Sequence, residues 1–168
     1  MQIRTAQREV ENFHKHHEYP TSIDNPQPMV DDELRDVAAD LQNLVAAYMD
    51  TAVRYQDAGD PRLYRLCLNM EELAEQYDAE ANHDEVAVAD ALGDRQFVLL
   101  GDCVTHGMEL EEIFKAVAIS NATKKIRSED DPRMRDKGEH YQPPDIKAAL
   151  EAGQRRRDFE RKLDNERL

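Results

Sequence analysis

The stretch VAVADALGDRQFVLLGDCV (86–104) decides the fold of this chain, because as a helix it is apolar on nearly every side. Such a helix is stable only where neighbouring helices bury most of its surface. We therefore expect a central helix over about 85–106, which Gly107 ends in the usual C′ position. The rest of the chain is expected to supply the helices that cover it.

A long amphipathic helix is expected on the N-terminal side of this stretch. Over about 33–55, apolar residues recur every three or four positions, as the buried face of a helix requires. Asp60 is a good N-cap residue and Pro61 suits the first helical position. A further helix is therefore expected over about 62–80.

Three more helices are expected, over about 5–17, over about 109–125, and from Asp145 to the C-terminus. Between the first helix and the long one, YPTSIDNPQP (19–28) contains three prolines, which are incompatible with regular structure. We expect that stretch to be a loop.

The whole pattern predicts an all-α protein. No segment alternates apolar and polar residues over the length of a strand, and the expected helices have short connections, as in a helical bundle. The 168 residues fit one domain, 1–168, with a very polar C-terminal extension over 153–168.

The composition limits the partners of the chain. Its formal net charge of −14 repels a phosphate backbone, so binding to DNA or RNA is not expected. A small phosphorylated substrate is repelled too, unless bound cations reverse the local sign. No apolar run suits a membrane span, and the N-terminus lacks the apolar core of a signal peptide. Cys67 and Cys103 lack metal-binding spacing and suit a reducing, cytoplasmic setting.

Asp90 and Asp94 interrupt the apolar stretch one helical turn apart, so their carboxylates project from the same face. That face continues to Phe97 and Val98 and is expected to be buried. Two buried carboxylates destabilise a protein unless a cation pairs with them. Gly93 weakens the helix and suggests that another segment packs closely there.

Three more acidic residues lie on the preceding helix. Glu71 and Glu75 are four residues apart, and Glu72 and Glu75 are three apart, so they share one face. Antiparallel packing of the two helices would bring all five carboxylates together, and oxygen ligands suit Mg²⁺ or Mn²⁺. Taken alone, the glutamates fit a solvated face better; together with the two aspartates, they favour a metal site.

The order of several short motifs resembles that of the MazG-like all-α nucleoside triphosphate pyrophosphohydrolases. The nearest pattern is that of the phosphoribosyl-ATP pyrophosphohydrolase-like subgroup, some of whose members are encoded by phages. EELAE (71–75) matches the EExxE of the family, and ADALGD (89–94) matches its next motif. NATK (121–124) and KGEHYQPPD (137–145) follow in the order of the subgroup, and Phe13–His14 resembles its N-terminal start.

The resemblance implies hydrolysis of a nucleoside triphosphate between its α- and β-phosphates, which gives a monophosphate and pyrophosphate. It implies two or three Mg²⁺ or Mn²⁺ ions per site, bound by Glu71, Glu72, Glu75, Asp90 and Asp94. The implied catalytic residues are Glu71, which would orient or deprotonate the attacking water, and Glu72. The implied substrate-binding residues are His14, Asn121, Lys124, Lys125, Lys137 and Tyr141, with Arg133 and Arg135 in the same loop.

Two departures from the family pattern bear on these expectations. The glutamate of the family's ExxD motif falls on Ala91, which has no ligand atom, and Asp90 is the expected replacement. The helix over 32–55 is expected to be an insertion relative to compact members of the family. Its expected role is in oligomerisation or as a lid over the substrate.

The expected substrate is a purine deoxynucleotide, with dGTP or GTP as the first candidate. The expected biological role is control of the nucleotide pool. The resemblance also implies a homodimer or homotetramer in the cytoplasm, that of the host where a phage encodes the protein. His14, His16 and His17 have no evident fourth ligand for a transition metal. Contact of Phe13 or His14 with the nucleobase is the preferred role, although simple packing of Phe13 fits equally well.

A second class of protein stays open on the sequence alone. A non-enzymatic acidic adaptor, or an inhibitor that imitates the charge of a nucleic acid, also accounts for the net charge. It predicts acidic residues spread over the surface and no requirement for metal. The expected burial of Asp90 and Asp94 argues against it.

Overall fold

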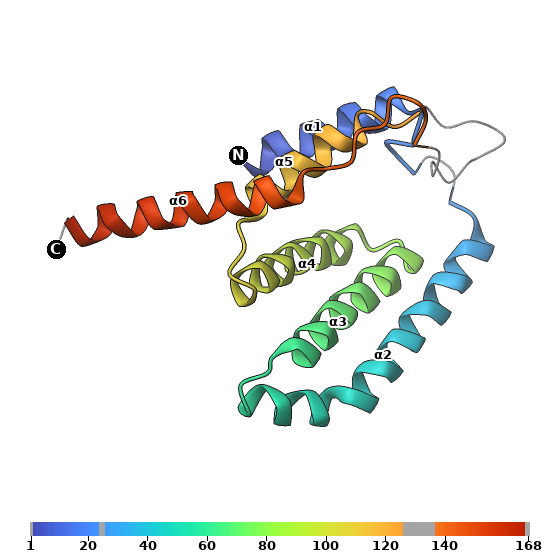
Figure 1. Ribbon diagram of the computed structural model, residues 1–168. Coiled ribbons are helices and arrows are strands. Elements are labelled where there is room, and N and C mark those ends of the chain that lie inside the picture. The colour runs from blue at the N-terminus through green and yellow to red at the C-terminus, as the bar shows by residue number, and fades with distance from the viewer. Residues whose placement is uncertain (1, 24–25, 126–136, 167–168) are drawn as a thin grey trace. The chain divides into compact units, whose positions relative to one another are not determined.

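The computed structural model describes residues 2–23, 26–125 and 137–166. Within these residues the chain forms six α-helices and no strand (Figure 1), so the all-α prediction is confirmed. The helices divide into two compact units. We call Asp24–Gly107 the central unit, and Met1–Ile23 with Met108–Leu168 the terminal unit.

Three helices make up the central unit: α2 (Pro28–Asp57), α3 (Arg62–Ala81) and α4 (Glu85–Thr105). Within this unit α3 packs against both α2 and α4 (Figure 1). Buried small residues recur at multiples of seven on the two helices of the α2–α3 interface: Ala38, Ala52, Cys67, Ala74 and Ala81. Because the distance between packed helices depends on the side chains at the contact, these residues let α2 and α3 approach closely.

The helix boundaries differ from the predicted ones where a proline begins a helix. α2 starts at Pro28 rather than near Glu33, because the first N–H groups of a helix have no partner inside it and a proline is tolerated there. In α3, Pro61 is the N-cap residue and the predicted cap, Asp60, precedes it. Asp60 still accepts hydrogen bonds from the side-chain Nε (2.8 Å) and backbone N (3.2 Å) of Arg62. These bonds lower the pKa of Asp60 to about 2.

A polar clamp joins α3 to α4. Arg65 Nε donates to Asp102 Oδ1 (2.6 Å), and the same guanidinium donates to the carbonyl oxygen of Val98. Asn69 Nδ2 donates to the other carboxylate oxygen of Asp102 (2.8 Å). Burial opposes ionisation of Asp102, but the hydrogen bonds from Arg65 and Asn69 hold its pKa below the usual value. The clamp therefore keeps a charged pair in place on the α3–α4 interface.

Two further polar links join the C-terminal half of α3 to its neighbours. Arg95 on α4 donates to the side-chain oxygen of Gln76, which is buried on α3. Arg35 on α2 donates to the carbonyl oxygen of Ala81 in the last turn of α3 (2.8 Å). A cation near the end of a helix satisfies carbonyl groups that have no partner inside the helix.

α4 is less buried than the sequence predicts. Among its described residues only Ala91 and Val98 are buried, whereas Val86, Phe97 and Val104 are each at least 78 % exposed. The expected burial on most sides, with Phe97 in the core, is therefore wrong. The reason is that α4 packs in its unit chiefly against α3, through one face. Gly107, with φ of 62°, follows the helix as predicted.

The two glycines of α4 have different surroundings. A Cβ at Gly101 would lie 2.5 Å from Arg65 Nη2, so this glycine leaves room for the clamp. A Cβ at Gly93 would have no neighbour within 4 Å among the described residues. The prediction that another segment packs closely against Gly93 is therefore wrong.

The terminal unit contains α1 (Ile3–His16), α5 (Leu110–Asn121) and α6 (Ile146–Glu166), and α5 contacts the other two helices. α5 ends at Asn121 instead of continuing to about residue 125. After it, the chain turns and binds the segment that leads into α6. Ser120 Oγ donates to the carbonyl oxygen of Gln142 (2.7 Å), and the Gln142 backbone N donates to Thr123 Oγ1 (2.9 Å).

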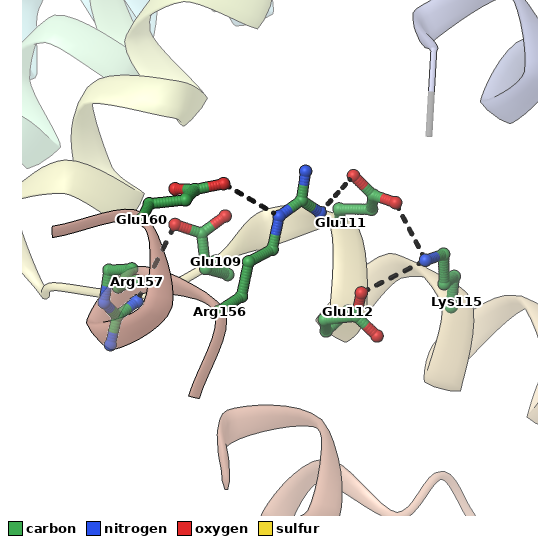
Figure 2. Close-up of polar contacts among 7 residues, drawn as sticks. All are labelled: Glu109, Glu111, Glu112, Lys115, Arg156, Arg157 and Glu160. Carbon is green, nitrogen blue, oxygen red and sulfur yellow. Dashed lines mark hydrogen bonds and ion pairs between the residues drawn. The ribbon is translucent and has the colours of Figure 1, made fainter. Parts of the chain in front are cut away.

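Ion pairs join the start of α5 to α6 (Figure 2). Glu111 lies between Lys115 and Arg156, with N–O distances of 2.8 Å to each. Arg156 also binds Glu160 (3.2 Å). Hydrogen bonds from Lys115 and Arg156 hold the pKa of Glu111 well below its usual range. The polar C-terminal segment is thus helical as far as Glu166 and is attached to α5 by its charges. None of the described helices has the length and apolar content needed to cross a membrane.

Replacement of each of the two α4 glycines by alanine tests the polar clamp between Arg65 and Asp102. Gly93→Ala is expected to raise the free energy of unfolding by about 1 kcal/mol, because alanine favours a helix and no neighbour obstructs it. Gly101→Ala gains the same propensity but displaces Arg65, so it should be less stable than Gly93→Ala by about 1–3 kcal/mol. Urea unfolding measures both. Equal stabilisation by the two alanines would contradict the clamp.

Glu111→Gln is expected to destabilise the protein at pH 7 and to flatten the pH dependence of its stability in acid. A depressed native pKa means that Glu111 contributes its full stability above the ordinary glutamate pKa of about 4.3, and loses it as the pH falls through the lower native value. Thermal unfolding at pH 7, 5 and 3 measures the effect. Glu151→Gln on α6, whose carboxylate lies 4.0 Å from Arg155, is the control and should show little change.

Candidate functional site

All five predicted metal ligands lie in the central unit, on the two helices that pack together. Glu71, Glu72 and Glu75 come from α3, and Asp90 and Asp94 come from α4. The spacing of three and four residues places each set on one side of its helix, as the sequence predicts.

Glu72 is the centre of this acidic group. Its Oε2 atom is buried and has no hydrogen-bond partner among the described residues. Burial raises the pKa of Glu72, and so do the negative charges of Glu75, Asp94, Glu71 and Asp90, in decreasing order. The other four carboxylates therefore lie near enough to Glu72 to repel its negative charge. Ionised Glu72 is therefore destabilised by its surroundings.

The chemistry of this group fits a hard divalent cation. A buried carboxylate oxygen without a partner is costly, and bound cations reverse the electrostatics of an acidic cluster. The donors are oxygen atoms only, which Mg²⁺ and Mn²⁺ prefer. Among the described residues, no three His, Cys, Asp or Glu side chains form a group that already has ligating geometry. The five carboxylates therefore do not form a preformed set of metal ligands in this structure.

The two predicted aspartate ligands of α4 are less buried than the sequence predicts. Asp90 and Asp94 are exposed, so the expectation that they lie on a buried face is wrong. The buried residue between them is Ala91, which is 3 % exposed and occupies the position of the family's glutamate. α4 meets α3 through Ala91 and Val98, which leaves the two aspartates beside that contact line. The replacement of the missing glutamate by Asp90 stays a prediction.

α2 contributes a wall beside the acidic residues, which the sequence did not reveal. Glu71 and Glu75 line a cavity of about 400 Å³ together with four residues of α2: Gln42, Val45, Ala46 and Met49. The apolar spacing of α2 predicts a buried face but does not say that part of this face borders the carboxylates. The cavity therefore places an apolar surface and one amide next to two predicted metal ligands.

The six predicted substrate-binding residues lie in the terminal unit, and four of them line one of two pockets there. Lys124 and Lys125 line a pocket of about 670 Å³ formed with the segment from Gly138 to Gln142. Lys137 Nζ lies 4.8 Å from the ring centre of Tyr141, whose hydroxyl is 3.4 Å from Ser120 Oγ.

The other two predicted substrate-binding residues, His14 and Asn121, line a second pocket between α1 and α5. His14 Nδ1 lies 3.2 Å from the carbonyl oxygen of Pro20. Arg133 and Arg135 lie outside the described residues.

A comparison with protein-family models matches residues 50–121 to the family described as Phosphoribosyl-ATP pyrophosphohydrolase. Over these residues the chain is similar to that family. The matched segment contains the end of α2 and all of α3, α4 and α5. No curated protein and no solved structure matches the chain.

The family match bears directly on the acidic residues. All five lie within the matched segment, and so does Asn121. The resemblance to the MazG-like pyrophosphohydrolases is therefore confirmed, and the match supports nucleotide pyrophosphohydrolase activity as the general reaction class. A pyrophosphohydrolase is a better account of the acidic cluster than a non-enzymatic adaptor.

Glu72→Gln is expected to stabilise the metal-free protein at pH 7 by a few degrees in Tm, because it removes a charge that burial and four neighbours disfavour. The native pKa of Glu72 is raised, so its ionised form destabilises the protein above that pKa. This penalty disappears as the pH falls through the native value towards about 4.3. Thermal unfolding in EDTA measures the effect. Glu33→Gln, on an exposed part of α2, is the control and should leave Tm unchanged.

Proposed function

We propose that this protein hydrolyses a nucleoside triphosphate to the monophosphate and pyrophosphate, with Mg²⁺ or Mn²⁺ bound by the carboxylates of α3 and α4. One observation carries the proposal. Glu72 has a buried, unpartnered oxygen in a region where four other carboxylates raise its pKa. Such an arrangement is unfavourable by itself and is relieved by bound divalent cations.

The residues that would hold the metal ions are Glu71, Glu72, Glu75, Asp90 and Asp94. Two or three ions per site would neutralise the charge that develops on the phosphate oxygens. They would also overcome the repulsion between a polyphosphate and a chain whose formal net charge is −14.

In the proposed reaction, side chains of the protein orient the attacking water and accept its proton. Water attacks the α-phosphorus, the bond from that phosphorus to the bridging oxygen breaks, and pyrophosphate leaves with the bridging oxygen. Glu71 is proposed to orient the water and accept its proton, with Glu72 as the second catalytic residue.

The proposed substrate is a purine deoxynucleotide, with dGTP or GTP first, and the proposed role is control of the nucleotide pool. His14, Asn121, Lys124, Lys125, Lys137 and Tyr141 are proposed to bind it. The lysines supply positive charge in an acidic chain, which suits phosphate groups. We also propose a homodimer or homotetramer. An outward row of half-exposed apolar residues on α2 supports this: Val37, Leu44 and Tyr48.

The direct test is incubation of the full chain with Mg²⁺ or Mn²⁺ and each common ribo- and deoxyribonucleoside triphosphate. The expected products, separated by chromatography, are one monophosphate and pyrophosphate. Glu72→Gln and Asp94→Asn should each reduce kcat/KM at least about 100-fold, as the loss of several kcal/mol of charge stabilisation requires. Glu33→Gln should keep the activity of the natural sequence.

Two results would overturn the proposal. The first is no turnover of any nucleotide by a folded protein that also fails to bind Mn²⁺ in a calorimetric titration. The second is pyrophosphate release that survives Glu72→Gln and Asp94→Asn unchanged, since the reaction would then take place elsewhere.

A further inference from the structure

Arg95 on α4 is a cation in an acidic region, and no carboxylate pairs with it. The other two arginines of α3 and α4, Arg62 and Arg65, each form an ion pair with an aspartate. Within the described part of the chain Arg95 forms none, although Asp94 directly precedes it and its guanidinium is bonded to a neutral amide. In a chain with a formal net charge of −14, this is a positive charge that the protein itself does not neutralise.

A neutral partner holds the guanidinium of Arg95 in place. It donates to the side-chain oxygen of Gln76, which is buried on α3. The amide nitrogen of Gln76 in turn donates to Glu80, one turn further along α3. The amide of Gln76 is thus oriented from both sides, with its oxygen towards Arg95. Arginine has five N–H donors in a planar fork, so this one partner leaves other donors for a ligand.

Arg95 lies at the edge of the acidic group. Its partner Gln76 directly follows Glu75 and lies one helical turn after Glu72, on the same face of α3. The main causes that shift the pKa of Glu72 are burial and four carboxylates, and no cation is among them. Arg95 therefore stands beside the carboxylates without neutralising them.

The guanidinium is also accessible. Ala91, one turn before Arg95 on α4, is buried and has no ligand atom. Arg95 itself is exposed, although its side chain reaches across to α3. Beside the acidic group, α4 thus presents a cation that a solute can reach.

These properties fit an anion that also binds divalent cations. A guanidinium fork matches the oxygen atoms of a phosphate group, to which it donates two parallel hydrogen bonds. Carboxylates beside it would repel a simple anion, but they attract one that carries bound metal ions, as a polyphosphate does. In a nucleoside triphosphate, the two terminal phosphates carry most of the negative charge, and hydrolysis at the α-phosphorus releases them as pyrophosphate.

We propose that Arg95 binds the two terminal phosphate groups of the nucleotide, with Gln76 and Glu80 as positioning residues that hold its guanidinium in place. The proposal rests on the function proposed above, and it adds a substrate-contacting residue from the central unit. Arg95 would stabilise the negative charge that develops on the leaving pyrophosphate, in addition to the metal ions that the carboxylates bind.

The test measures pyrophosphate binding directly, so it does not depend on turnover. Magnesium pyrophosphate is titrated calorimetrically into the full chain in excess Mg²⁺, and Mn²⁺ binding is titrated separately. Arg95→Gln keeps a hydrogen-bonding group but removes the charge. It should weaken pyrophosphate binding at least about tenfold, as loss of charge-assisted hydrogen bonds predicts, without weakening Mn²⁺ binding. With nucleotide, the same variant should lower kcat at least about 100-fold.

Two control variants separate loss of the charge from loss of the link between the helices. Arg54→Gln on α2 removes the same charge from an exposed arginine that also binds a neutral side chain, Thr51, and should leave pyrophosphate binding intact. Gln76→Leu breaks the link to α3 but keeps the guanidinium, so it should weaken pyrophosphate binding less than Arg95→Gln does. Equal losses in these two variants would make Arg95 a link between helices only and overturn the proposal. Circular dichroism verifies that each variant is folded.

The outcomes distinguish this proposal from the proposed reaction. If Arg95→Gln binds pyrophosphate as tightly as the natural sequence, or if the natural sequence does not bind it, this proposal fails even where hydrolysis is confirmed. Loss of Mn²⁺ binding in Arg95→Gln also overturns it, since the residue then acts through the metal ligands. Pyrophosphate binding that depends on Arg95, in a protein that hydrolyses no nucleotide, supports the phosphate contact and counts against the reaction alone.

Discussion

Mutual repulsion between carboxylates is the constraint on which the central unit depends. Four other acidic side chains of α3 and α4 raise the energy of ionised Glu72, and nothing in that group itself attracts one helix to the other. The attraction comes from elsewhere on the same interface. Arg65 binds Asp102 and the Val98 carbonyl, while Arg95 binds Gln76. These cations lie outside the acidic group, so they hold the helices together without neutralising it.

The α3–α4 interface contains two kinds of carboxylate: one paired with cations of the protein, and one without such a partner among the described residues. Asp102 also lies on α4, but hydrogen bonds from Arg65 and Asn69 satisfy it and lower its pKa. Glu72 has the opposite surroundings and the opposite shift. Two carboxylates on one interface thus differ in role because of their neighbours. Unsatisfied acidic groups in a cavity-lined region are the kind that bind cations or transfer protons.

Much of the fold and of the acidic site followed from local sequence. The helix periodicity of α2, the Gly107 boundary of α4 and the spacing of Glu71, Glu72 and Glu75 all depend on residues a few positions apart. The burial of individual acids did not follow. A helix that is apolar on almost every side gives no signal of which face meets its neighbour, so Asp90 and Asp94 were placed in the core and Glu72 was not distinguished from Glu71 or Glu75. The burial of His17 was missed for the same reason, because nothing in HKHH shows that its last ring is enclosed.

The sequence by itself determined that this chain is helical, acidic and equipped with two sets of carboxylates at helical spacing, and its motifs indicated the resemblance that the family match supports. These properties depend on backbone hydrogen bonding and side-chain periodicity within single helices, which the order of residues specifies directly. Only the tertiary structure decided that Ala91 faces α3, that α2 forms a wall beside Glu71 and Glu75, and that His17 closes a pocket against α5. Those contacts join residues far apart in the chain, and burial, pKa and pocket shape depend on which faces meet.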